Sequence, residues 1–181
     1  IFLITKNDDD SVSVTNRATG QSQTVKTGEA AIINVDACDV LTEAAAKQVL
    51  GAGAEKGNTA AGNASSDDIS VTNCNYNYKP VTTGPALQQL QSAVAAGILA
   101  RSAKTKTGAE SNKAVFGPQK PAGVQDVSGY GDKAYFNPKF GQLNILKGGN
   151  WYILSHYTGV SPSKGTLEDA KKLADAVKNN L

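Results

Sequence analysis

Apolar residues recur at helical spacing in three segments of the chain. The segments are 42–50, 85–104 and 166–181. Thr42 is a natural N-cap for the first, and Pro85 suits the first position of the second. Thr166 is the N-cap of the third, with Asp169 three positions later as a variant of the capping box. In the second segment the apolar stripe consists of Leu87, Leu90, Val94 and Ile98. The spacing predicts three amphipathic helices.

Other segments alternate apolar with polar residues, which is typical of strands. The alternating segments are 69–78, 134–136, 142–147 and 151–157, and the β pattern of the second half begins at Val124. Gly148, Gly149 and Asn150 supply positive φ angles between the last two, which form the clearest hairpin. Consecutive strands joined by short turns indicate an antiparallel sheet. The chain is therefore predicted to be an α+β domain, with helices packed on an antiparallel sheet in the order α-β-α-β-β-β-α.

The first 31 residues differ from the rest because they are polar and poor in large apolar groups. We expect residues 1–31 to be a mobile tether near a membrane, with short strands around Val12 and Val14 as an alternative, and residues 32–181 to be one folded domain. The apolar run of residues 1–4 has two interpretations. It is either the outer end of a removed membrane segment or an edge strand.

The composition of the chain argues against several classes of partner and cofactor. The 181 residues are 40% hydrophobic and 19% charged, with 18 basic against 16 acidic side chains and a net charge of +2. Because basic and acidic side chains are nearly equal in number, the charge of the chain argues against nucleic acid or an anionic membrane surface as partner. Cys38 and Cys74 fit either free thiols in a reducing compartment or one bridge in an oxidising one. One histidine and two distant cysteines do not supply a metal site, and no cofactor is indicated.

Four short motifs occur in an order that resembles a known family. Residues 36–43 read Asp-Ala-Cys-Asp-Val-Leu-Thr-Glu, and Gly51 closes the helix that follows. Cys74-Asn75-Tyr76 lies on a predicted strand, and residues 129–135 read Gly-Tyr-Gly-Asp-Lys-Ala-Tyr. A hairpin and a C-terminal helix follow. This pattern resembles the extracytoplasmic bacterial lipoproteins and sensor-like domains of unknown function, over about residues 34–181.

The resemblance implies an extracytoplasmic α+β domain with a Cys38–Cys74 bridge. The family has no agreed catalytic residues, so it assigns none to this chain. Lipoproteins of this kind begin their mature chain with a lipidated cysteine, and no cysteine lies near residue 1. A transmembrane anchor therefore fits this chain better than a lipid.

The residues that usually perform catalysis are sparse. His156 is the single histidine, and Ser155 precedes it on a predicted strand. Adjacent strand residues point to opposite faces, so the two do not form a nucleophile–base pair, and we expect a structural histidine. Asp132 is the carboxylate to consider instead. It lies between Gly129, Gly131 and the next strand, where an Asp usually accepts bonds from backbone amides of a turn.

Aromatic residues are the better candidates for binding. They are Tyr76, Tyr78, Tyr130, Trp151 and Tyr157. Exposed rows of such rings bind sugars, peptides or partner proteins, and the alternative is a core built of aromatics. The sequence thus favours a membrane-anchored, non-catalytic binding or sensor domain. Its partner is an unidentified envelope ligand or surface protein, with no nucleic acid and with membrane contact only through an N-terminal anchor. The alternatives are an envelope hydrolase with an unrecognised site and a structural or adhesive surface protein.

Overall fold

An antiparallel sheet forms the centre of the molecule and carries helices against it, as the sequence predicts. The computed structural model describes residues 2–6, 11–16, 20, 22–26, 32–57, 65–118, 120–159 and 165–181. The main sheet has seven strands within these ranges, in the order β4-β5-β6-β10-β9-β8-β7. Its strands are β4 (Glu55–Lys56), β5 (Ile69–Tyr78), β6 (Val94–Ala103), β7 (Gln125–Asp126), β8 (Lys133–Asn137), β9 (Gln142–Lys147) and β10 (Asn150–Thr158).

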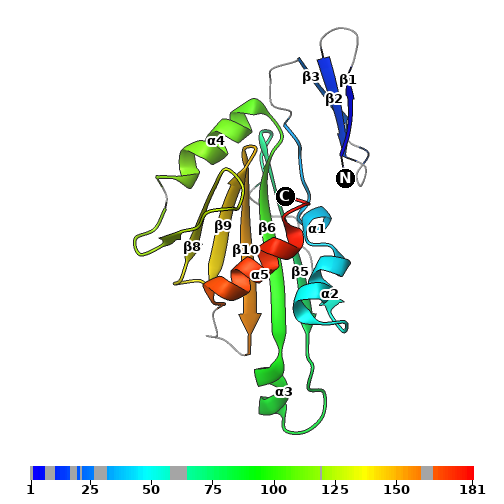
Figure 1. The fold of residues 1–181 in the computed structure, drawn as a ribbon, viewed down its shortest axis with the longest axis vertical. Coiled ribbons are helices and arrows are strands. Elements are labelled where there is room, and N and C mark those ends of the chain that lie inside the picture. The colour runs from blue at the N-terminus through cyan, green and yellow to red at the C-terminus, as the bar shows by residue number, and fades with distance from the viewer. Residues whose placement is uncertain are drawn as a thin grey trace.

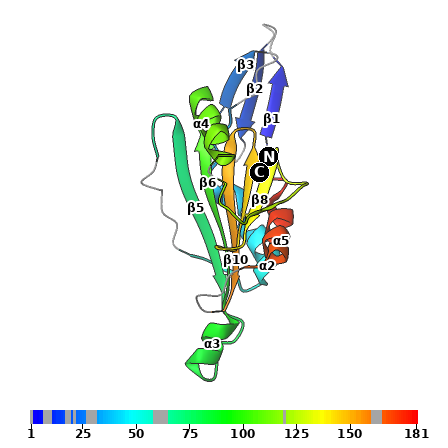
Figure 2. The ribbon, with the colours of Figure 1, turned by 90° about the vertical axis from the view of Figure 1, so that its left-hand side faces the viewer.

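Five helices accompany the sheet in the described residues. They are α1 (Ala37–Val40), α2 (Glu43–Leu50), α3 (Ala86–Ser92), α4 (Lys106–Phe116) and α5 (Leu167–Val177). Helices α2 and α5 lie together on one side of the sheet, whereas α3 extends beyond one end and α4 lies near the other (Figures 1 and 2). The α+β class with an antiparallel sheet is therefore confirmed.

The predicted helix caps are present. The Thr42 side chain accepts a hydrogen bond from the amide of Ala45. The Thr166 side chain accepts one from the Asp169 amide, and the Asp169 carboxylate accepts one from the Thr166 amide, which completes a capping box. Because each bond satisfies an amide that the first helical turn leaves without a partner, these short polar motifs fix where α2 and α5 begin.

The main core fills the space between the sheet and helices α1, α2 and α5. Side chains of even number on β5, β6 and β10 point into it, among them Cys74, Ile98 and Leu154. From the helices, Val40 of α1 and Leu173 of α5 are fully buried against them. Since successive strand residues alternate between faces, the odd-numbered residues of β5, β6 and β10 lie on the opposite face.

The prediction of one helix over residues 85–104 is wrong. Helix α3 ends at Ser92, and Val94 begins the central strand β6. The strand buries alternate side chains, Ala96, Ile98 and Ala100, instead of one helical stripe. The segment is rich in alanine, which favours helices, and Val94 and Ile98 continue the helical spacing of Leu87 and Leu90. Its ten residues pair along β5 on one side and its first eight pair with β10 on the other, and this pairing satisfies backbone groups on both edges.

Helix α4 is not among the three predicted helices, because its first turns are mostly polar and show no apolar stripe. Thr105 caps it by accepting a bond from the Gly108 amide. Its last residue, Phe116, is buried against Tyr135 and Trp151, with ring centroids 5.0 and 5.6 Å away. The helix is mostly polar because it buries only a narrow face against the end of the sheet.

The segment expected to be a tether contains strands. Strands β1 (Phe2–Lys6), β2 (Ser11–Asn16) and β3 (Ser22–Lys26) form a separate antiparallel sheet in the order β1-β2-β3. The apolar run therefore includes an edge strand, although Leu3 and Ile4 remain exposed. Among the described helices, none has the length and apolar character needed to cross a membrane.

Candidate ligand-binding cleft

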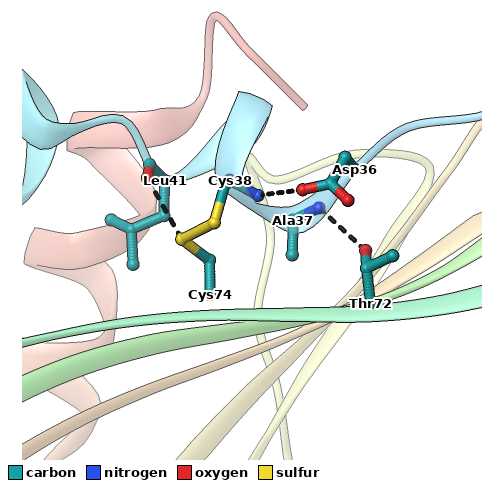
Figure 3. The surroundings of a disulfide bond; sticks show 6 residues. All are labelled: Asp36, Ala37, Cys38, Leu41, Thr72 and Cys74. Atoms are coloured by element: carbon teal, nitrogen blue, oxygen red, sulfur yellow. Dashed lines mark hydrogen bonds between the residues drawn. A yellow bond between two sulfur atoms is a disulfide. The ribbon is translucent and has the colours of Figure 1, made fainter. Parts of the chain in front are cut away.

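A disulfide between Cys38 and Cys74 joins helix α1 to strand β5 (Figure 3). The Cα atoms of the two residues are 5.0 Å apart. The surrounding hydrogen bonds fix the same junction: the Asp36 side chain accepts from the Cys38 amide at 2.8 Å, and the Ala37 amide donates to Thr72 Oγ1 at 2.8 Å. The predicted bridge is confirmed, and it holds the start of the helical layer on the central sheet.

A cleft of about 800 Å³ lies at the end of the sheet where β5 and β10 finish and β6 begins. The space between the sheet and the helices, in contrast, is filled by the core. The residues that line the cleft are Gly53, Glu55, Lys56, Asn77, Tyr78, Lys79, Thr82, Ala93, Val94, Ala95, Tyr157 and Gly159. Four strands and the connection to α3 therefore contribute to one concave surface, which is the candidate site of this protein.

Strand register explains why the cleft is open. Asn77 pairs with Ala95, and Ala95 pairs with Tyr157, so the three form one row across β5, β6 and β10. The row lies on the sheet face opposite α2 and α5, since neighbouring Tyr76 points into the core. Because Ala95 ends at its methyl group, it leaves space between the longer side chains of Asn77 and Tyr157.

Tyr78 approaches the cleft from the other sheet face and lies against the turn after α2. A Cβ atom on Gly53 would lie 2.6 Å from Tyr78 Cε2, and one on Gly51 would lie 3.0 Å from Cε1. Contacts to both edges of the ring show that it lies across these two glycines. Any side chain at Gly53 would displace the ring, so the glycine turn sets the position of Tyr78.

The charged residues of the cleft lie at its rim. Glu55 and Lys56 form the short edge strand β4, and Lys79 follows β5; all three are exposed. The salt bridges found in the described part of the chain involve none of them. With two ammonium groups and one carboxylate, the rim carries a net charge of +1 and its charges remain available to a ligand.

The structure brings only two of the five candidate aromatics together, Tyr78 and Tyr157. Tyr76 is buried in the core, where burial and the charge of Glu43 raise the pKa of its phenol. Tyr130 is partly buried, and its hydroxyl donates to Asp175 Oδ1 at 3.3 Å. Trp151 packs on Phe116 and donates from Nε1 to Asn144 Oδ1 at 3.0 Å. These three serve packing.

The glycine-rich turn before β8 is structural. Gly131 has φ +58°, and the Asp132 amide donates to Leu146 O at 2.7 Å. One carboxylate oxygen of Asp132, Oδ2, accepts from the amide of Gly148 at 2.9 Å. Gly148 lies in the turn that starts β10, whereas the cleft lies where β10 ends. Gly129, Gly131 and Asp132 therefore connect two turns at the far end of the strand.

His156 and Ser155 point to opposite faces of β10, as expected. His156 is buried beneath α5, and Nδ1 has no hydrogen-bond partner in the described residues. Burial lowers the pKa of this imidazole; Asp169 opposes that shift and Lys172 adds to it. Neither residue lines the cleft.

Sequence reasoning missed most of the cleft, including Gly53, Asn77, Lys56 and Lys79. One available signal was the Gly-Ala-Gly sequence directly after a helix, which marks a close approach of another group to the backbone. Among the described residues, no group of three or more His, Cys, Asp or Glu side chains is placed to hold a metal ion. No family model, curated protein or solved structure matches the chain. The cleft is therefore interpreted from its own side chains.

Proposed function

We propose that this chain is an extracytoplasmic binding or sensor domain that is anchored to a bacterial membrane through its N-terminal end and holds its ligand, without chemical conversion, in the cleft at the end of β6. The observation that carries the proposal is the cleft itself. It combines two tyrosines, one side-chain amide, one threonine hydroxyl and three charged groups with several small residues.

The disulfide supports the proposed location. Structural disulfides persist in oxidising compartments outside the cytoplasm and are rare inside it. Cys38–Cys74 joins α1 to β5, and Cys74 is almost fully buried. The resemblance of residues 34–181 to extracytoplasmic lipoprotein and sensor-like domains points to the same compartment. The proposed anchor rests on that resemblance, because residues 2–6 form the edge strand β1.

The types of residue in the cleft support binding over hydrolysis. Glu55 is the one carboxylate among the lining residues, and the other charged residues that line the cleft are Lys56 and Lys79. Most glycoside hydrolases use two carboxylates that flank the bond they cleave. Serine or cysteine hydrolases pair the nucleophile with a neighbouring base, usually histidine. The lining residues match neither arrangement.

A structural or adhesive role is the second candidate, because one observation favours it. Leu87 and Leu90 are 61% and 46% exposed on α3, and α3 has no buried residue. These leucines lie one helical turn apart, and the chain carries no charged residue from Pro80 to Ala100. A protein partner that covers α3 would bury both side chains.

An NMR titration distinguishes ligand binding in the cleft from binding of a partner to α3. Soluble oligosaccharides and peptides released from bacterial envelopes are titrated into ¹⁵N-labelled protein, and amide shifts are mapped. We expect shifts at residues 53–57, 77–79, 93–95 and 157–159. Ala95→Trp, which fills the space between Asn77 and Tyr157, should abolish them. Ala114→Trp is the matched control, because Ala114 is exposed on α4.

Binding that survives Ala95→Trp would contradict the proposal, as would shifts confined to Leu87 and Leu90. Mass spectrometry of the added material after incubation supplies the second readout. We expect the ligand to be recovered intact, whereas a product formed by wild-type protein and lost in Glu55→Gln would establish a hydrolase.

A further inference from the structure

We infer that the cleft accepts a saccharide that carries a carboxylate group. This inference rests on the proposed binding function and names the chemical class of the ligand. It is drawn from three features of the lining: where the rings lie, which polar groups surround them, and what net charge the rim carries.

The two rings flank a single strand. Tyr78 on β5 pairs with Val94, and Tyr157 on β10 pairs with Ala95, so the two tyrosines come from the two strands that neighbour the start of β6 and their rings lie on opposite sheet faces. Both tyrosines are partly exposed, and both line the cleft. The C–H bonds on one face of a pyranose ring carry slight positive charge and pack against the electron-rich face of an aromatic ring. Because the two tyrosines lie on opposite faces of the sheet, a saccharide that reaches around the start of β6 would meet one ring on each face.

The uncharged polar groups that line the cleft suit the hydroxyl groups of a saccharide. Asn77 offers an amide that donates and accepts, and Thr82 offers a hydroxyl that does both. Sugar hydroxyls need this mixture, because each one is both donor and acceptor. The small side chains of Ala93 and Ala95 leave room in the cleft for a sugar ring.

The net charge of the rim selects an acidic sugar over a neutral one. Lys56 and Lys79 face the cleft with one carboxylate, Glu55, and none of the three is engaged in a salt bridge found in the described residues. An anionic substituent would meet an excess of positive charge at the rim. Because these ammonium groups are exposed, salt should weaken the attraction.

An acidic peptide is the competing ligand, and the strand arrangement argues against it. Extended peptides commonly bind by adding a strand to a free sheet edge. Next to the cleft, β4 already occupies the edge of β5, with Glu55 paired to Asn77 and Lys56 paired to Tyr76. The sheet edge at the cleft is therefore β4, whose two residues are too few to pair with an extended peptide, so the cleft suits a ligand held by side chains better than an added strand.

Calorimetry with three compounds tests the inference. The first is a tetrasaccharide of alternating glucuronic acid and N-acetylglucosamine, the second is the neutral tetramer of N-acetylglucosamine, and the third is tetraglutamate. We expect the acidic saccharide to bind at least tenfold more tightly than the other two. Tyr157→Ala and Lys79→Gln should each weaken it about tenfold or more. Lys147→Gln is the matched control, since Lys147 is exposed at the far end of β9.

Each other outcome has a defined meaning. Equal affinity for the acidic and neutral saccharides, or tighter binding of tetraglutamate, would overturn the inference. So would a failure of all three compounds to bind. In any of these cases the Ala95→Trp experiment tests separately whether the cleft is a binding site at all. If envelope material still binds in a way that Ala95→Trp abolishes, the cleft is a binding site for another ligand class; if Ala95→Trp has no effect, the binding function itself fails.

Discussion

His156 on β10 and Asp169 on α5 face each other across the sheet–helix interface, with 3.8 Å between Nδ1 and Oδ1. Asp169 also completes the capping box of α5 by accepting from the amide and hydroxyl of Thr166. The helix start and the buried imidazole thus share one carboxylate. Burial is the largest influence on His156 and lowers its pKa below 6.5, so the folded protein favours the neutral ring.

This relationship predicts loss of stability in mild acid. Because the pKa of His156 is lower in the folded state, its contribution is present above pH 6.5 and is lost as the pH falls through the folded value. Urea titrations between about pH 7 and 5 should show the unfolding free energy falling by up to about 1.4 kcal/mol per pH unit.

The control is His156→Gln, which should remove most of this slope. The pKa of Asp169 is also lowered, from 3.8, so its contribution is lost only at more acidic pH and does not mask the histidine. An unchanged slope in His156→Gln would show that other groups cause the acid sensitivity.

Removal of the disulfide should destabilise the domain without changing the fold. Cys38 and Cys74 are separated by 36 positions. The chain-entropy model for a loop of that length gives about 3–4 kcal/mol. We expect the double variant Cys38→Ala/Cys74→Ala to lose this amount in denaturant titrations while it keeps a similar circular dichroism spectrum. Two reactive thiols in unreduced, denatured wild-type protein would contradict the bridge.

Two glycines of one turn should respond differently to alanine. A Cβ on Gly131 would lie 2.4 Å from the carbonyl oxygen of Leu146, whereas one on Gly129 would meet nothing within 4 Å. Both residues have positive φ, so both variants carry backbone strain. The steric conflict should make Gly131→Ala about 1–3 kcal/mol less stable than Gly129→Ala. Equal unfolding free energies would show that the turn relaxes without cost.

Loss of the Asp132 carboxylate should lower the stability of the fold and leave ligand binding in the cleft unchanged. It accepts from the Gly148 amide, which lies at the opposite end of β10 from the cleft. Asp132→Ala should lower the unfolding free energy by about 1 kcal/mol. Asp132→Asn should lose less, because the amide oxygen can still accept. Loss of ligand affinity with unchanged stability would instead assign Asp132 a functional role.

Deletion of residues 1–31 should leave the melting temperature of the main domain nearly unchanged. Within the described residues, the core clusters begin at Ile33, and strands β1, β2 and β3 contribute nothing to them. Stability follows buried apolar area, so a segment outside the core contributes little. Thermal unfolding of residues 32–181 checks this expectation; a fall of many degrees would mean that the small sheet is integral to the domain.

The sequence by itself determined the local features of this protein. Thr42 and Thr166 marked where two helices begin, because a side-chain oxygen satisfies an amide only a few residues away. The turn at 148–150 predicted the β9–β10 hairpin for a similar reason, since its glycines adopt positive φ. The cysteine pairing came from motif resemblance and is confirmed. Each of these signals depends on neighbours in sequence or on a recognised pattern.

Only the tertiary structure decided the rest. Residues 94–103 carry a helical stripe, yet they form the central strand because β5 and β10 each need a partner for their backbone groups. The cleft exists because register places Ala95 between Asn77 and Tyr157, and because Gly53 lies beneath Tyr78. His156 lies near Asp169 because α5 packs on the face of the sheet to which His156 points. These are contacts between distant segments, and their energies depend on pairing and packing that local sequence patterns do not encode.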